Sequence, residues 1–235
     1  MSRALKIGHQ TTRMHHIFVY GDSLAWGIIP LSRNRLPFEA RWPGVLEADL
    51  LAMGLSVRVT EDCLNGRRTV FEDPFKPGRN GLFGLEQRIE SQSPLNLVIL
   101  CLGTNDFQAV HTTTPWQSAQ GILALVTAIR RAPIEPGMPI PEILIVAPPL
   151  MTEPKGPIAP KFAGAPARSA ALALAYSEVA RELRCHFFDA GSVIPSSAVD
   201  GVHLDADQHL RLGHALALVI AGLLSHIGAQ PLHHG

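Results

Sequence analysis

Five short apolar runs recur along the chain, and stretches with helical spacing lie between them. Residues 95–102, written LNLVILCL, are apolar at all positions but one, which is typical of a central strand buried on both faces of a parallel sheet. Strands that alternate with helices predict an α/β domain with a parallel sheet. The predicted strands are residues 17–20, 56–60, 95–102, 143–147 and 186–189.

Helices are predicted between and after these strands. A Thr-Pro-Trp-Gln sequence at residues 114–117 combines an N-cap, a proline at the first helical position and a capping-box glutamine. Asp205 and Gln208 have the capping-box spacing just before the last helix. Apolar residues at helical spacing predict further helices over residues 42–53 and 170–183.

Two long segments, residues 65–87 and 148–166, are rich in proline and glycine and fit no helix or strand. Loops of this length in a compact domain are usually functional or mobile. Each follows a predicted strand, so we expect both to line the same cleft.

Composition and charge narrow the class of protein. The chain has 235 residues, 46% of them hydrophobic, and no formal net charge. This is a globular composition, and without a basic excess there is no electrostatic footprint for nucleic acid. The cysteines are odd in number, far apart and in apolar surroundings, so we expect buried thiols and no metal site. They are Cys63, Cys101 and Cys185.

The ends of the chain bear on its organisation and location. Residues 1–13 are polar and lack the apolar core of a secretory signal. The apolar run in the last helix is too short to span a bilayer. We therefore expect a cytoplasmic protein with a flexible extension over residues 1–13, a single domain over residues 14–228 and a tail over residues 229–235.

Polar, glycine-bearing segments lie just past the predicted strands. They are Gly21-Asp22-Ser23, Asn65-Gly66, Gly103-Thr104-Asn105-Asp106 and, before the last helix, Asp200-Gly201-Val202-His203. Ligands bind outside the carboxyl ends of the strands in an open parallel sheet. We therefore expect these four segments to converge on one edge of the sheet.

These segments contain the groups that nucleophilic catalysis needs. A serine hydroxyl is a poor nucleophile until an imidazole accepts its proton, and the imidazole needs an acceptor that fixes its tautomer. Ser23, His203 and Asp200 are predicted to fill these roles. The oxyanion is predicted to bind the N–H groups of Ser23 and Gly66 and the side-chain amide of Asn105. Taken singly, the serine and the asparagine would be ordinary turn residues.

Further residues lie beside these groups. Asp22 and Asp106 are expected to be structural, because short carboxylates in loops commonly accept backbone N–H groups. The predicted substrate-binding residues are Ala25, Trp26, Ile28 and Asn65. Trp26 is equally compatible with a place in the core.

The motifs GDSL at residue 21, GTND at residue 103 and DGVH at residue 200, together with Gly66, resemble the four blocks of the SGNH (GDSL-type) hydrolases, in order. RWPGVL, LNGR and FDAG resemble the arylesterase/acyltransferase branch. The resemblance implies a flavodoxin-like three-layer α/β/α sandwich with a five-stranded parallel sheet and no cofactor or metal. It also implies hydrolysis of short-chain acyl esters, with acyl transfer to alcohols or peroxide in some relatives.

Several alternatives remain open from the sequence. Within the same family they are a carbohydrate acetylesterase and a lysophospholipase or thioesterase. A non-catalytic flavodoxin-like binding module for a nucleotide or flavin would need a phosphate-binding glycine-rich loop after the first strand, which the sequence lacks. As partners we expect a small-molecule ester and further copies of this chain in a homo-oligomer, but neither nucleic acid nor a membrane.

Overall fold

A five-stranded sheet forms the centre of the computed structural model, which describes residues 14–228 and the side chains up to residue 225. All strands are parallel, in the order β2-β1-β3-β4-β5. They are β1 His15–Gly21, β2 Val57–Cys63, β3 Leu97–Cys101, β4 Glu142–Ala147 and β5 His186–Asp189. All five predicted strands are confirmed. β2 is longer than predicted, because its polar end stays paired with β1 until Cys63 lies opposite Gly21.

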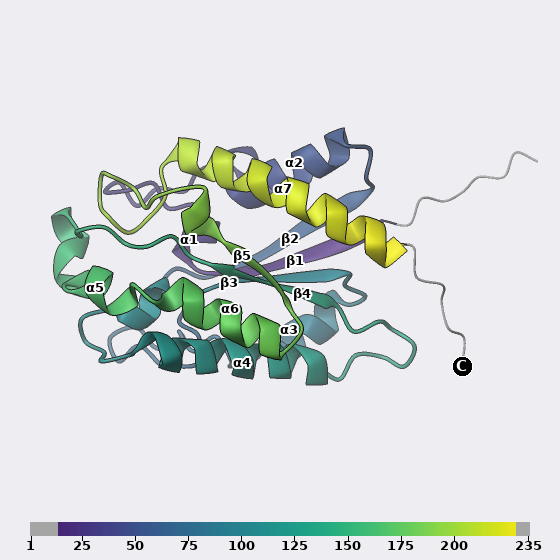
Figure 1. Ribbon diagram of the computed structural model, residues 1–235, viewed down its shortest axis with the longest axis horizontal. Coiled ribbons are helices and arrows are strands. Elements are labelled where there is room, and N and C mark those ends of the chain that lie inside the picture. The colour runs from purple at the N-terminus through teal and green to yellow at the C-terminus, as the bar shows by residue number, and fades with distance from the viewer. Residues whose placement is uncertain (1–13, 229–235) are drawn as a thin grey trace, which may run out of the picture.

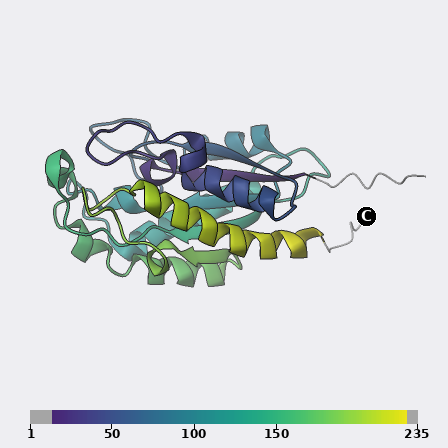
Figure 2. The ribbon, with the colours of Figure 1, turned by 90° about the horizontal axis from the view of Figure 1, so that it is seen from above.

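Helices cover both faces of the sheet (Figure 1). α2 (Trp42–Ala52) and α7 (Ala206–Gly228) lie side by side on one face, as the view from above shows (Figure 2). α3 (Leu85–Gln92), α4 (Pro115–Arg131) and α6 (Leu172–Glu182) cover the other face. This arrangement and the strand order confirm the predicted flavodoxin-like three-layer sandwich.

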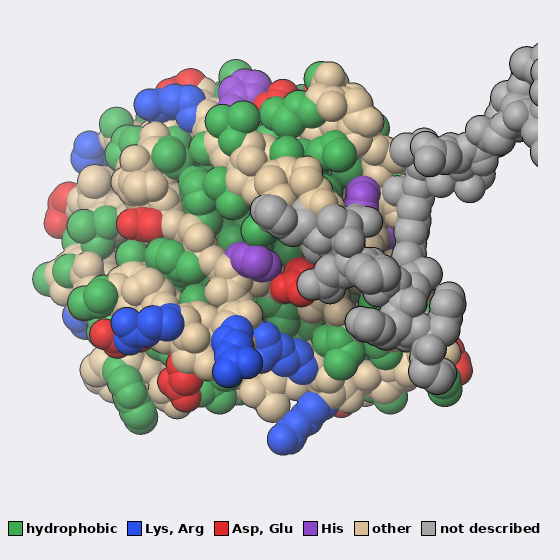
Figure 3. Space-filling model, turned by 45° about the vertical axis from the view of Figure 1, so that its right-hand side comes forward, with side chains coloured by type: hydrophobic (Ala, Val, Ile, Leu, Met, Phe, Trp, Pro, Cys, Tyr) green, Lys and Arg blue, Asp and Glu red, His purple; other side chains and the backbone are tan. Residues whose placement is uncertain are grey.

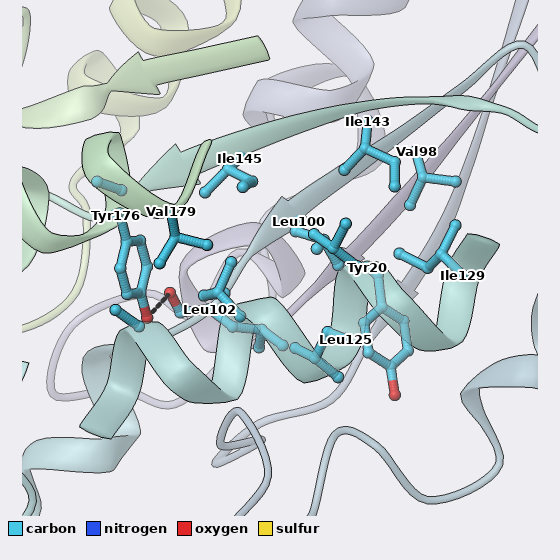
Figure 4. Close-up of a cluster of buried hydrophobic side chains, with 14 of the residues drawn as sticks. Tyr20, Val98, Leu100, Leu102, Leu125, Ile129, Ile143, Ile145, Tyr176 and Val179 are labelled. Atoms are coloured by element: carbon cyan, nitrogen blue, oxygen red, sulfur yellow. Dashed lines mark hydrogen bonds between the residues drawn. The ribbon is translucent and has the colours of Figure 1, made fainter. Parts of the chain in front are cut away.

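The sheet separates two apolar cores, because alternate side chains of a strand point to opposite faces. Ile17 and Val19 of β1 pack with α2 and α7, whereas Phe18 and Tyr20 belong to the cluster on the other face. Figure 4 shows part of that second cluster, including Tyr176, whose hydroxyl group donates to the carbonyl oxygen of Leu102 at 3.2 Å. The buried hydroxyl group of Tyr176 is thus paired rather than left without a partner.

Some local predictions are confirmed and others need correction. Thr114 caps α4 with the predicted reciprocal bonds to Gln117. α3 was not predicted, because it is short and starts after Gly84 without a capping side chain. The segment 148–166 is not structureless, since it forms a 3₁₀ helix (Gly156–Phe162) and the start of α5 (Ala165–Ser169). Its prolines hide these short helices from a periodicity search.

The surface and the thiols add two observations. On the face drawn in Figure 3, hydrophobic, acidic and basic side chains are interspersed. Within residues 14–228, no helix is both long and apolar enough to cross a membrane.

The three cysteines are free thiols, of which Cys101 is buried and the other two are half-buried. The predicted extension and tail, residues 1–13 and 229–235, lie outside the described residues.

Candidate active site

The four predicted segments meet around one cavity of about 220 Å³ at the carboxyl ends of the strands. In Figure 1 this is the left-hand end of the sheet, where α1 (Ser23–Trp26) and α5 lie. Both long segments, 65–87 and 148–166, contribute to the cavity lining, as predicted. The predicted site residues that line it are Ser23, Ile28, Asn65, Gly66, Asn105, Asp200 and His203.

Ser23 is held where β1 turns into the short helix α1. Asp22 is the N-cap of that helix, and its Oδ1 accepts the N–H of Leu24 at 2.9 Å. The helix ends after one turn at Gly27, whose left-handed backbone (φ 83°) is the usual glycine termination. This tight geometry places the Ser23 side chain directly at the end of the strand, with only 5% of the residue exposed.

Asp200 and His203 form a closed pair just before α7. Nδ1 of His203 lies 2.7 Å from Oδ2 of Asp200, and Oδ1 of Asp200 accepts the N–H groups of Val202 and His203, each at 2.9 Å. Gly201 makes this loop possible, because it has a φ of 78° and a Cβ there would lie 2.4 Å from the carbonyl oxygen of Glu153. When Nδ1 donates to the carboxylate, Nε2 keeps the lone pair that a general base needs.

The Asp200 carboxylate is ionised within this pair. Burial raises the pKa of Asp200, but the hydrogen bonds from the ring and backbone of His203 outweigh it, so that the pKa lies below its usual value. A carboxylate that stays charged can orient the imidazole and stabilise its protonated form.

Gly66 follows β2 in a turn that only glycine adopts easily, with a φ of 86°. Arg79 steadies this turn, since its Nε donates to the carbonyl oxygen of Asn65 at 3.0 Å. The loop that carries the backbone N–H of Gly66 is therefore held in place by Arg79, a residue outside the motif.

Asn105 lies in the 3₁₀ turn (Thr104–Phe107) after β3, and its amide group is fully engaged. Its Nδ2 donates to Oδ2 of Asp22 at 2.9 Å and to the carbonyl oxygen of Arg67 at 3.2 Å, while its Oδ1 accepts from Nε2 of Gln108 at 3.2 Å. These bonds fix which side of the amide faces Asp22. An oxyanion bound to Asn105 would therefore share the amide N–H groups with Asp22 and with the carbonyl oxygen of Arg67.

Two buried carboxylates support the site from behind, and both accept loop N–H groups as predicted. Burial raises the pKa of Asp22 to about 6, against hydrogen bonds from Leu24 and Asn105 that lower it. Asp106 accepts hydrogen bonds from the backbone and hydroxyl groups of Thr69 and from the Ser118 hydroxyl. Neither carboxylate lines the cavity.

The comparisons with known proteins agree with this arrangement. The model of the GDSL-like lipase/acylhydrolase family matches residues 19–215. The chain belongs to this family. A comparison with curated protein sequences gives no match.

Solved structures include close relatives of this GDSL-family chain. It is similar to the native aryl esterase of M. smegmatis, with 36% identity and a TM-score of 0.84 over 89% of this chain and 99% of that one. It is also similar to Est24, a carbohydrate acetylesterase from Sinorhizobium meliloti, with 35% identity and a TM-score of 0.83 over 89% and 99%. A carbohydrate acetylesterase family member from the same organism is 37% identical, with a TM-score of 0.84 over 90% and 99%.

Not every predicted substrate-binding residue of this GDSL-family chain reaches the cavity. Ala25 is buried in the core beneath α2 and α7. Trp26 lies in a separate hollow, with the Arg35 guanidinium 4.7 Å above its ring. Ile28 and Asn65 do line the cavity.

Sequence reasoning did not single out several residues that line the cavity. They are Leu31, Arg33, Lys76, Pro157, Ile158, Lys161 and Phe162. For the five residues in segments 65–87 and 148–166, the only signal was the position of these segments after strands. Leu31 and Arg33 lie outside both segments and had no signal.

Proposed function

We propose that this chain is a serine esterase that hydrolyses short-chain acyl esters through a covalent acyl-enzyme. The observation that carries the proposal is the hydrogen-bonded Asp200–His203 pair, which lines the same cavity as Ser23 and the predicted oxyanion donors. Membership of a lipase/acylhydrolase family and similarity to esterases support it.

In the proposed reaction, Ser23 Oγ attacks the ester carbonyl carbon while Nε2 of His203 takes the hydroxyl proton. The bond to the alcohol oxygen then breaks, and His203 returns the proton to the leaving alcohol, so that the acyl group stays on Ser23. Water attacks the acyl-enzyme with the same proton transfers and releases the acid. Asp200 holds the imidazole in the required tautomer.

The proposed oxyanion site consists of the N–H groups of Ser23 and Gly66 and the amide of Asn105. Donors aimed at the developing charge commonly contribute about a hundred- to a thousandfold each to the rate. Among the predicted substrate contacts, the proposal retains Ile28 and Asn65, because only these two line the cavity.

Hydrolysis of p-nitrophenyl acetate tests the proposal. Ser23→Ala should lower kcat by about a thousandfold or more, because the nucleophile is lost. Ser91→Ala, an exposed serine on α3, is the matched control and should leave kcat unchanged. Mass spectrometry after treatment with a fluorophosphonate should locate one adduct, on Ser23. A Ser23→Ala enzyme with wild-type turnover would reject the mechanism.

A carbohydrate acetylesterase is the second candidate, favoured by the similarity to Est24. A series of aryl esters of increasing acyl length, assayed beside acetylated sugars, separates the two. Adding an alcohol acceptor or peroxide to the same assays tests the proposed acyl-transfer side activity, which would yield a new ester or peracid in place of the free acid.

We also propose that the chain forms a homo-oligomer. Phe75 and Phe83, both in the segment 65–87, are 81% and 82% exposed. Phenylalanine is enriched in protein–protein interfaces relative to the rest of the surface. Light scattering should give a mass above that of one chain, and Phe75→Ser with Phe83→Ser should lower it. A wild-type monomer at working concentration would contradict the proposal.

A further inference from the structure

Three basic side chains line the cavity that holds Ser23 and His203. They are Arg33, Lys76 and Lys161, and they come from two loops and a 3₁₀ helix that are distant from one another in sequence. A fourth cation, Arg79, packs beside Gly66, where its Cδ and Nε would lie 3.7 Å from an added Cβ. The cavity is thus strongly basic in a chain whose net charge is zero.

These cations lack close counter-charges. No carboxylate of the described residues lies within salt-bridge distance of Arg33, Lys76 or Lys161. The guanidinium group of Arg79 donates to backbone carbonyl groups, and its backbone N–H donates to Oε1 of Glu72 at 2.7 Å. The acids around them already have partners. Buried Asp73 accepts the N–H groups of Phe75 and Lys76, and Asp200, which lines the same cavity, is paired with His203.

The positive charges also affect one another. Burial lowers the pKa of Lys161, and the charges of Lys76, Arg33 and Arg79 lower it further, against an opposing effect of Asp73. The pKa of Lys76 is lowered for the same reasons, burial first and the two arginines next. An anion bound among these groups would relieve their mutual repulsion.

The backbone holds Arg33 at the cavity at some cost. Leu31 and Arg33 have left-handed backbone conformations, with φ of 62° and 59°, which residues other than glycine rarely adopt. The turn is closed by bonds from the N–H of Arg33 to the carbonyl oxygen of Ile29 and from the N–H of Ile29 to that of Asn34. Unfavourable conformations of this kind cluster at ligand sites.

The remaining lining is apolar. Ile28, Leu31, Pro157, Ile158 and Phe162 contribute hydrocarbon surface to the same cavity. A ligand that fits both parts has an apolar body and a negatively charged group. A neutral ester would offer these cations no counter-charge.

We propose that the preferred substrate is an anionic ester, in which the acyl chain or the leaving group carries a carboxylate or phosphate that binds Arg33, Lys76 and Lys161. The inference rests on the proposed esterase function and names the class of ester for the same site. Several charge-assisted contacts from these exposed side chains should together favour the anionic ester by about ten- to a hundredfold in kcat/KM.

Matched ester pairs test the proposal. For the acyl side, p-nitrophenyl butyrate is compared with mono-p-nitrophenyl succinate, in which a carboxylate replaces the terminal methyl group. For the leaving-group side, phenyl acetate is compared with 3-carboxyphenyl acetate and with its 3-phosphonooxy analogue. The anionic member of at least one pair should have the higher kcat/KM. The pair that shows this preference identifies whether the anion belongs to the acyl chain or to the leaving group, and whether it is a carboxylate or a phosphate.

Charge variants test whether the named residues cause the preference. Lys76→Gln, Lys161→Gln and Arg33→Gln should each lower the anionic-to-neutral ratio of kcat/KM by about two- to fivefold. Arg131→Gln, an equal charge change at the end of α4 and outside the cavity, should leave both esters unchanged. Raising the salt concentration from about 0.05 M to about 0.5 M should also lower the ratio.

The possible outcomes are distinct. If Ser23-dependent hydrolysis is intact but no anionic ester is preferred, the anion site is refuted and the esterase proposal stands. A preference that all three glutamine variants retain would also refute it. If Ser23→Ala hydrolyses both members of a pair like the wild type, the proposed function itself fails.

Discussion

Asp22 offers the sharpest test of how the buried charges of this site work. Burial raises its pKa from 3.8 to about 6, so the folded protein binds the proton more tightly than the unfolded chain. Ionised Asp22 therefore destabilises the fold. The cost is absent below pH 3.8, grows as the pH rises towards 6 and is complete above it. Because one pKa unit is worth about 1.4 kcal/mol, the full cost is about 3 kcal/mol.

Asp22→Asn removes the charge but also changes what Asn105 meets. The new amide oxygen can still accept the N–H of Leu24, whereas its NH₂ group would face the Nδ2 of Asn105 as donor against donor. The lost hydrogen bond to a charged group is worth about 1.5–3 kcal/mol, which offsets most of the gain at neutral pH. We expect kcat to fall by about a hundredfold, because Asn105 loses the acceptor that orients it.

Urea unfolding of both proteins between about pH 4.5 and pH 7.5 measures this effect. The unfolding free energy of Asp22→Asn should rise by about 2 kcal/mol relative to wild type over that interval. Other carboxylates titrate in both proteins, so their contributions cancel in the difference. Asp207→Asn, an exposed acid on α7, is the control and should show no such trend. Parallel curves for Asp22→Asn and wild type would refute the raised pKa, and an unchanged kcat would refute the role in orienting Asn105.

Three further substitutions probe the rest of the site. Asp200→Asn should lower kcat by about a thousand- to ten-thousandfold with little change in KM, because the imidazole of His203 loses the acceptor that fixes its tautomer. A near-normal kcat in steady-state kinetics would contradict the proposed role of the Asp200–His203 hydrogen bond. Gly66→Ala should cost about 1–2 kcal/mol in urea unfolding and lower kcat, because the strain comes from the left-handed backbone rather than from crowding; an unstrained, fully active variant would contradict this. Asp106→Ala should cost about 3–5 kcal/mol, because Arg68 is left buried without its counter-charge; thermal unfolding at the wild-type temperature would show that the contact is dispensable.

The sequence allowed the sheet to be predicted because its physics is local and repetitive. A strand that is buried on both faces consists of consecutive apolar residues, so β3 could be predicted from LVILC alone. The convergence of Ser23, Gly66, Asn105 and His203 followed from one rule about the ends of parallel strands. Both predictions depend on the order of the elements along the chain and not on side-chain packing.

The cavity lining could not be predicted in the same way, because it depends on tertiary contacts between loops. Leu31 lies against Gly156, where an added Cβ would come within 2.8 Å of its Cδ2. That contact brings the loop of Arg33 next to the 3₁₀ helix of Lys161. Nothing in the local sequence of either loop indicates the other. Trp26 was misleading because it shares helix α1 with Ser23 but lines a separate hollow.

The buried acids and the basic cavity lining are connected through the charge of the transition state. A developing oxyanion near Asn105 would lie close to the Asp22 carboxylate, which already accepts one of the protons of that amide. Two negative charges at such a site repel each other strongly, since buried charges are poorly screened. Positive groups on the same cavity oppose this repulsion, and Arg33, Lys76 and Lys161 are placed to do so. Removing one of them should therefore slow the hydrolysis of neutral esters slightly and of anionic esters much more, which makes the ratio of the two rates the informative quantity.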